Sequence, residues 1–117
     1  MTAPHCEHDA PRTFVFRLIP RRASFALDMS EEEREIMGRH AAHWQPLIDS
    51  GQMVVFGPML DETGSWGLGI AEADDEAELR ALAASDPAVV AGIAKIELGT
   101  MLGGFVRARE RRRAGVP

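Results

Sequence analysis

The chain has few of the features that would place it outside the cytosol or in a membrane. Its 117 residues include a single cysteine, Cys6, so no internal disulfide can form, and we expect a reducing compartment. No apolar run approaches the roughly 20 residues of a membrane-spanning helix, and no secretory signal pattern opens the sequence. These absences predict a cytoplasmic protein without membrane contact.

A basic face of the kind that binds nucleic acid is also missing. Residues 12–106 carry eight lysines and arginines against fifteen aspartates and glutamates, so the body of the protein is acidic. Positive charge gathers from Arg107 onward, where five arginines accompany one glutamate. We therefore expect no nucleic-acid partner and interpret the arginine-rich end as a solvated tail.

Length and composition predict one folded domain between two tails. A chain of this size is ordinarily a single domain. Residues 1–11 hold two prolines and no periodic pattern, and residues 108–117 are rich in arginine, so we expect both segments to be disordered. The folded domain is then residues 12–107.

Hydrophobic periodicity predicts six elements in the order βαββαβ within this domain. Ser30 and Glu33 form the pattern of a capping box that begins the first helix, and Gly51 is placed to end it. The second helix should end at Asp86-Pro87, before a short apolar turn at 88–92. The predicted elements are strands at 13–19, 53–59, 65–73 and 93–106 and helices at 31–49 and 75–85.

This order is the split βαβ pattern of a ferredoxin-like sandwich, which is an α+β fold. Two helices can cover only one face of a four-stranded sheet. The second face should then be polar, yet the segment Met53–Phe56 is apolar on both sides. A second copy of the sheet would cover it, so we expect a homodimer joined through the sheet faces.

A histidine stands on the apolar stripe of the first predicted helix. At about 100° per residue, His40 falls within the apolar arc and His43 lies at its edge. A histidine in such a place either bonds a backbone carbonyl in the core or faces a pocket, and spacing alone leaves both interpretations open. The apolar stripe consists of Ile36, Met37, Ala41, Trp44, Leu47 and Ile48.

Several short motifs then follow one another at spacings that are distinctive when taken together. They are His40, Gly51, Gly57-Pro58, Asp86-Pro87 and Ala91-Gly92. With the βαββαβ order, they make residues 13–105 resemble the YCII-related (YciI-like) proteins. The resemblance implies a dimeric α+β barrel built from two ferredoxin-like units. It also implies a histidine–aspartate acid–base pair in a cleft, and one branch of the family is similar to dehydrochlorinases of chlorinated aromatic diols.

Carried over by position, His40 matches the family histidine. Asp86 is the first choice for its partner, and Asp61, just after Gly57-Pro58, is the second. A carboxylate beside a buried imidazole offsets the desolvation of its charged form and fixes its tautomer. Such a pair can act as a general acid or base, worth roughly 10²–10⁴ in rate.

Four further residues are candidates for binding a ligand: Arg39, His43, Ser65 and Trp66. The family often has an arginine three residues before the histidine, whereas this chain has Met37 there and Arg39 beside the histidine. Gly67 and Gly69 leave part of one strand bare, which either opens a cavity or permits close packing.

The sequence carries no dinucleotide fingerprint, no nucleophile motif and no zinc spacing, so we expect no cofactor and no metal. The leading hypothesis is a small enzyme that uses a His/Asp pair for elimination or hydrolysis on a small organic molecule. The alternatives are a dimer that binds a small ligand, or haem through His40, without catalysis, and a purely structural or regulatory dimer.

Overall fold

The computed structural model describes residues 12–105, and the expected tails at 1–11 and 108–117 lie outside the described residues. Two long helices and two short helical segments accompany four strands. In chain order the elements are β1 (Arg12–Pro20), the 3₁₀ helix η1 (Phe25–Leu27), α2 (Glu31–Ser50), β2 (Met53–Asp61), β3 (Gly64–Ala73), α3 (Glu76–Ala84), α4 (Pro87–Val90) and β4 (Ala94–Thr100).

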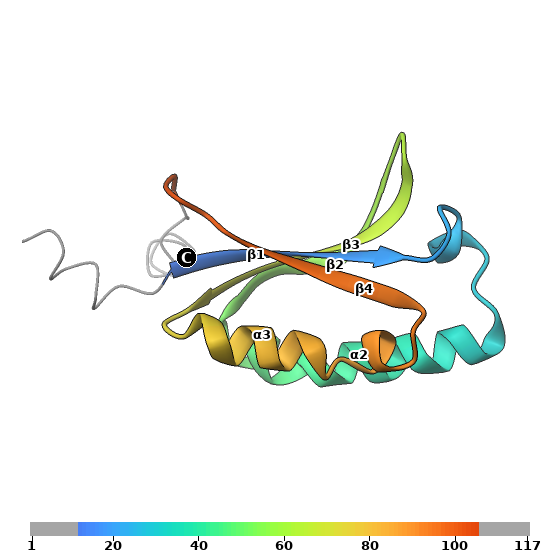
Figure 1. Cartoon of the computed structure of the whole chain (residues 1–117), viewed down its shortest axis with the longest axis horizontal. Helices are drawn as coiled ribbons and strands as arrows, with labels where there is room; N and C mark the ends of the chain where they lie inside the picture. Colours follow the sequence, from blue (N-terminus) through green and yellow to red (C-terminus); the bar gives the residue numbers. More distant parts are fainter. Residues whose placement is uncertain (1–11, 106–117) are drawn as a thin grey trace, which may run out of the picture.

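The four strands form one antiparallel sheet in the order β2-β3-β1-β4. The three α-helices lie on the same face of this sheet, with α2 and α3 side by side beneath it (Figure 1). This arrangement confirms the predicted α+β, ferredoxin-like βαββαβ fold. Among residues 12–105, no helix combines the length and the apolar character needed to cross a bilayer.

Some boundaries differ from the sequence prediction. The last strand was expected to reach residue 106 but stops at Thr100, because that residue already pairs with Phe14 near the start of β1. The predicted turn at 88–92 contains the short helix α4, since Asp86 caps its start and Pro87 suits a first helical position. The segment η1 was not predicted.

Helix α2 has the ends that the sequence predicts. The Ser30 side chain accepts a hydrogen bond from the Glu33 backbone, and the Glu33 carboxylate accepts one from the Ser30 backbone, which completes the capping box. Gly51 closes the helix with φ of 85°, a left-handed conformation that suits glycine. These caps set the first and last residues of α2, and so help to determine which of its side chains face the sheet.

The core lies between this helical layer and the inner face of the sheet. Alternate residues of β1 (Phe14, Phe16 and Leu18) are buried there. From α2, Ile36 and Trp44 pack against them. The two buried clusters are Phe14, Phe16, Trp44, Met53, Ala71, Ala73, Leu79 and Ala83, and Leu18, Phe25, Ile36, Ala88 and Ile93.

The outer face of the sheet is also apolar over three neighbouring strands. Val15 of β1 pairs with Ile70 of β3, which in turn pairs with Val55 of β2. Paired residues share a face, and these alternate with the buried inner positions of β1. Val55 is 44% exposed, so the single chain leaves part of this face open to solvent.

The loop between β1 and α2 is tied to the start of α2 by charge. Both terminal nitrogens of Arg22 donate to the buried Glu33 carboxylate at 2.8 Å, and Arg21 adds a bond of 3.2 Å. The hydrogen bonds from Arg22 and from the Ser30 backbone hold the pKa of Glu33 well below its usual range. The carboxylate therefore stays ionised and keeps the loop in place.

The same loop approaches the start of β3 at one glycine. Gly64 has φ of 120°, and a Cβ there would lie 2.5 Å from Cβ of Ala23 and 2.7 Å from its carbonyl oxygen. The Ser65 backbone N–H then donates to that carbonyl at 2.7 Å. Only a glycine allows this close approach of the loop to the sheet.

Replacing Gly64 should therefore destabilise the fold. We expect Gly64→Ala to lower the free energy of unfolding by about 1–3 kcal/mol. Alanine would have to adopt the positive φ of this position, and its Cβ would clash with Ala23. Gly38→Ala is the matched control, since Gly38 lies within α2 and a Cβ there meets nothing within 4 Å. It should raise stability by about 0.5–1 kcal/mol. Urea unfolding of both variants measures the changes, and an unchanged Gly64→Ala would contradict this account.

Candidate active site

Helices α2 and α4 bring His40 and Asp86 together. Asp86 is the N-cap of α4, where its Oδ1 accepts the Ala88 backbone N–H at 2.8 Å. Its other oxygen, Oδ2, lies 2.7 Å from Nδ1 of His40, about midway along α2. The first choice for a partner of His40 is thus the residue that the structure places beside it.

A second donor from α2 shares the same carboxylate oxygen. The indole Nε1 of Trp44 donates to Oδ2 of Asp86 at 2.6 Å. Trp44 lies four residues after His40, so both side chains project from the same face of the helix. Asp86 is 0% exposed, and each of its oxygens accepts at least one hydrogen bond.

These contacts decide the charge of the buried carboxyl. Burial by itself raises the pKa of Asp86, but the hydrogen bonds from His40, Trp44 and the Ala88 backbone together outweigh it and leave the pKa below its usual value. Asp86 is therefore ionised near neutral pH and can only accept hydrogen bonds.

The ionised partner also fixes the tautomer of His40. Since the carboxylate cannot donate, Nδ1 carries the proton, and in the neutral ring Nε2 keeps its lone pair. Within residues 12–105, no hydrogen-bond partner is found for Nε2, and no buried side-chain nitrogen or oxygen is left unpaired. With the side chain 13% exposed, Nε2 is open to an incoming molecule.

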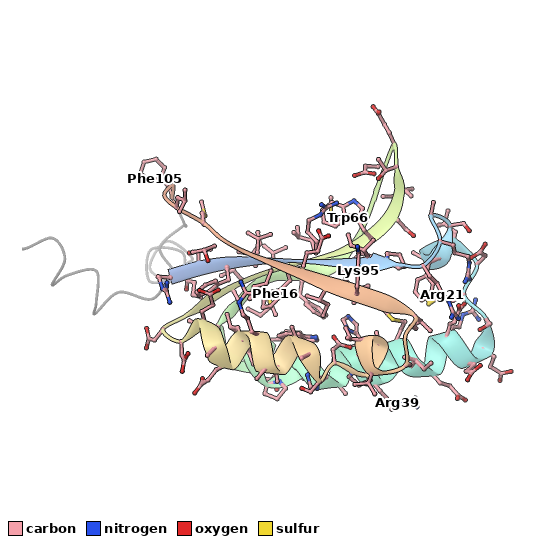
Figure 2. All side chains as sticks on the ribbon, in the orientation of Figure 1. Phe16, Arg21, Arg39, Trp66, Lys95 and Phe105 are labelled. Carbon is pink, nitrogen blue, oxygen red and sulfur yellow. The ribbon has the colours of Figure 1, made fainter. Side chains whose placement is uncertain are left out.

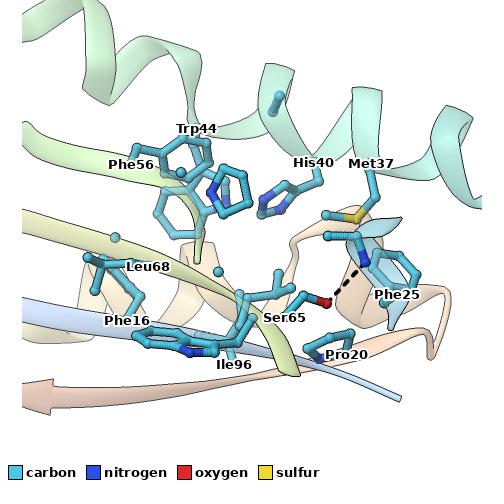
Figure 3. Close-up of a pocket in the computed structure, with 18 of the residues that line it drawn as sticks. Phe16, Pro20, Phe25, Met37, His40, Trp44, Phe56, Ser65, Leu68 and Ile96 are labelled. Carbon is cyan, nitrogen blue, oxygen red and sulfur yellow. Dashed lines mark hydrogen bonds between the residues drawn. The ribbon is translucent and has the colours of Figure 1, made fainter. Parts of the chain in front are cut away.

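That open nitrogen faces a cavity of about 310 Å³ between α2 and the sheet (Figure 3). The Phe56 ring stacks on the imidazole, with centroids 5.5 Å apart. Gly67 and Gly69 line the sheet side, and the space of their missing side chains is bordered by Leu18 and Phe16. The other lining residues are Pro20, Phe25, Ala26, Met29, Met37, Ala41, Trp44, Met53, Gly57, Pro58, Ser65, Trp66, Leu68 and Ile96.

Ser65 lines this cavity, but its hydroxyl is already engaged. The oxygen accepts the Ala26 backbone N–H at 3.0 Å and the hydroxyl donates to the Ala23 carbonyl at 2.9 Å. These bonds join the β1–α2 loop to β3 at the cavity wall (Figure 3). Ser65 therefore contributes to the cavity wall, and its hydroxyl has a structural role because both of its hydrogen bonds go to the β1–α2 loop.

The second choice for the partner of His40 was Asp61, and the structure does not bring the two together. Asp61 lies at the β2–β3 hairpin, where Thr63 and the Trp66 indole donate to its carboxylate. Hydrogen bonds from Thr63 and then Trp66 lower the pKa of Asp61. The turn satisfies this carboxylate, and Asp61 is not among the cavity-lining residues.

Trp66 lines the cavity, as expected of a ligand-binding candidate, but its polar atom is turned to other partners. Its Nε1 donates to Asp61 at 2.8 Å, and the Arg17 guanidinium lies 4.9 Å from its ring centroid. Trp66 can therefore offer a ligand apolar surface, while its N–H stays with the hairpin.

Arg39 and His43 do not line the cavity. Arg39 points away from the sheet on the solvent side of α2 (Figure 2), because its neighbour His40 takes the inward direction. Nε2 of His43 lies 2.8 Å from the Leu82 carbonyl oxygen of α3, so this ring joins two helices. The role in ligand binding that the sequence suggested for these two residues stays a prediction.

The sequence does not predict the roles of two residues of the site, the hydrogen-bond donor Trp44 and the stacking ring Phe56. Trp44 was read only as part of the apolar stripe, although a buried indole N–H requires an acceptor and its spacing of four from His40 points to a shared one. Phe56 stacks on His40 from β2, and no sequence signal relates the two. Within residues 12–105, no group of three metal-ligating side chains comes together.

Comparison with known proteins assigns the sequence to a family. The profile of the YCII-related domain matches residues 13–102. No curated protein matches the chain.

Among solved structures, one similar chain is the 5-chloro-2-hydroxyhydroquinone dehydrochlorinase (TftG) of Burkholderia phenoliruptrix AC1100, in complex with 2,5-dihydroxybenzoquinone. It is 20% identical with a TM-score of 0.60, covering 79% of this chain and 95% of that one. A protein of unknown function from Nitrosomonas europaea is 16% identical with a TM-score of 0.44, covering 85% and 97%. The match to the domain profile spans most of the sequence, and the chain belongs to the YCII-related family.

Proposed function

We propose that this protein is a small cytosolic enzyme that performs general acid–base chemistry on a small organic molecule. The observation that carries the proposal is the 2.7 Å contact between Asp86 and Nδ1 of His40, with the opposite nitrogen of the ring facing the cavity. Asp86 orients the ring and offsets the positive charge that forms on protonation, and His40 transfers the proton.

Elimination is the reaction that fits these residues best. Nε2 of His40 removes a proton from the substrate, the electrons of that bond form the new double bond, and the leaving group departs with the electron pair of its own bond. The imidazolium formed is held by the Asp86 carboxylate and can return its proton to the medium or to the leaving group. Hydrolysis would use the same base to activate a water molecule.

The fold neighbour supports the choice of elimination. TftG is a dehydrochlorinase, so a protein of similar fold eliminates chloride and a proton from a small aromatic molecule. The substrate in its name, 5-chloro-2-hydroxyhydroquinone, is accordingly the first probe to test here.

Replacing His40 should remove turnover without unfolding the protein. His40→Asn keeps a donor close to the position of Nδ1, and so can still serve Asp86, but it has no basic nitrogen. We expect kcat/KM for chloride release from 5-chloro-2-hydroxyhydroquinone to fall by roughly 10²–10⁴. Arg34→Gln, on the exposed side of the same helix, is the control and should keep the wild-type rate. A fully active His40→Asn would reject the proposed base.

We also propose that two copies associate through the outer sheet face. The apolar row of Val15, Ile70 and Val55, which is half-buried at the first two residues and exposed at the third, supports this, because a second copy of the same face buries it symmetrically.

This dimer can be tested by light scattering after size exclusion. The wild type should have twice the monomer mass, and Val55→Glu, which puts a charge at the most exposed residue of this row, should have the monomer mass. Leu27→Glu is the control, since Leu27 is also an exposed apolar residue, at 71%, but lies on η1, outside the sheet. This variant should stay dimeric. A monomeric wild type at micromolar concentration would refute the association.

A further inference from the structure

The cavity beside His40 has no formally charged side chain on its wall. Of its lining residues only His40, Trp44, Ser65 and Trp66 carry a nitrogen or oxygen atom on the side chain. The Trp44 N–H is bonded to Asp86. The Ser65 hydroxyl and the Trp66 N–H are already bonded to the β1–α2 loop and to Asp61. A ligand therefore meets one polar atom that is free to react, Nε2 of His40, in otherwise apolar surroundings.

The formal charge in contact with the reactive ring is negative. Asp86 contacts the far side of the imidazole at 2.7 Å and is fully buried. An anion in the cavity would lose its hydration and meet this field with no cation on the cavity wall, since Arg17 and Arg22, which contact the rings of Trp66 and Phe25, are not among the lining residues. A cation would also lose its hydration, and the Asp86 oxygens are already occupied by His40, Trp44 and the Ala88 N–H.

The lining is also rich in aromatic rings, which are Phe16, Phe25, Trp44, Phe56 and Trp66. Phe56 stacks on His40 with the two planes 26° apart, and Met37 and Phe25 lie on the other side of His40 from Phe56 (Figure 3). Met37 is one helical turn before His40, so its thioether lies on the same wall of α2 as the imidazole. A thioether offers a soft, polarisable contact to an aromatic ring and no charge.

We infer that the site takes uncharged aromatic molecules and discriminates against carboxylates and ammonium ions, and that Met37, one turn before His40, contributes by keeping this wall of the cavity uncharged. The inference refines the proposed function and rests on the same cavity. It concerns binding, so it can be measured without turnover.

Calorimetric titration with three naphthalenes of similar shape tests the preference. At pH 7, 2-naphthol is neutral, 2-naphthoate is anionic and 2-naphthylmethylamine is cationic. We expect 2-naphthol to bind at least tenfold more tightly than either ion, and His40 Nε2 to shift in ¹⁵N NMR on its addition. Equal affinity for an ion, or no binding of 2-naphthol, would overturn the inference.

Met37 is tested by two substitutions of similar length. Met37→Arg should raise the affinity for 2-naphthoate at least tenfold, because it brings a cation to the wall, whereas neutral Met37→Gln should not. If Met37→Arg folds and gains no affinity for the anion, the role of Met37 is refuted. If it does not fold, Met37→Lys provides the same cation. An inactive His40→Asn that still prefers 2-naphthol would separate binding from catalysis.

Trp44 is the second side chain that donates a hydrogen bond to Asp86. Its N–H donates at 2.6 Å to Oδ2 of Asp86, the same oxygen that faces Nδ1 of His40. The Trp44 ring is locked by packing on Phe16, with centroids 5.0 Å apart, and it is 2% exposed. We infer that Trp44 is a positioning residue, which holds the carboxylate of Asp86 in the orientation that His40 requires.

The role of Trp44 can be tested because three groups contact the Asp86 carboxylate. They are the side chains of His40 and Trp44 from α2 and the Ala88 N–H from α4, and among them His40 is the titratable group. The pKa of Asp86 is lowered on folding, so its contribution to stability is complete above the unfolded pKa and is lost as the pH falls through the folded one. Removing the indole donor raises the folded pKa and moves this loss to higher pH.

Trp44→Phe keeps the ring but removes the donor. We expect kcat for chloride release to fall roughly 10-fold to 100-fold, with KM nearly unchanged, and the acid unfolding midpoint to rise. In the Asp86→Asn background, Trp44→Phe should no longer move that midpoint, because the titrating group is gone. If Trp44→Phe lowers stability equally at every pH, or moves the acid midpoint as much in the Asp86→Asn background, the positioning role is refuted.

Discussion

The site depends on one buried carboxylate. Asp86 is fully enclosed and ionised, which its surroundings permit because His40 and Trp44 of α2 and the backbone of its own helix all donate to it. Removing any of these donors leaves a charge without its full set of partners. The same contacts join α4 to α2 and orient the imidazole, so packing and chemistry rest on one set of hydrogen bonds.

The sequence predicts the backbone well because its signals are local. The Ser30–Glu33 capping box and the left-handed Gly51 define α2 through contacts within a few residues, and the alternation in β1 marks its buried side. The predicted end of β4 was wrong because the pairing of β4 with β1 ends at Phe14 with Thr100, two residues after the start of β1. The end of β4 therefore depends on its pairing with β1, and the sequence of residues 101–106 does not indicate it.

The site was predictable only in part, for a similar reason. His40 stands out as a polar residue on an apolar stripe, and family resemblance favours Asp86, but spacing could not choose between Asp86 and Asp61. The structure separates them, since Asp61 is satisfied within its own hairpin by Thr63 and Trp66. Phe56 reaches His40 across the layers, and that contact depends on sheet register.

The shortest α-helix of the domain, α4, therefore controls the candidate active site. Helix α4 has four residues, and its first turn is closed by the Asp86 side chain on the Ala88 amide. A segment this small opens more readily than the sheet, and each opening releases the carboxylate from the histidine. Hydrogen exchange at the Ala88 amide would thus count the openings that disable the site, well before the domain unfolds as a whole.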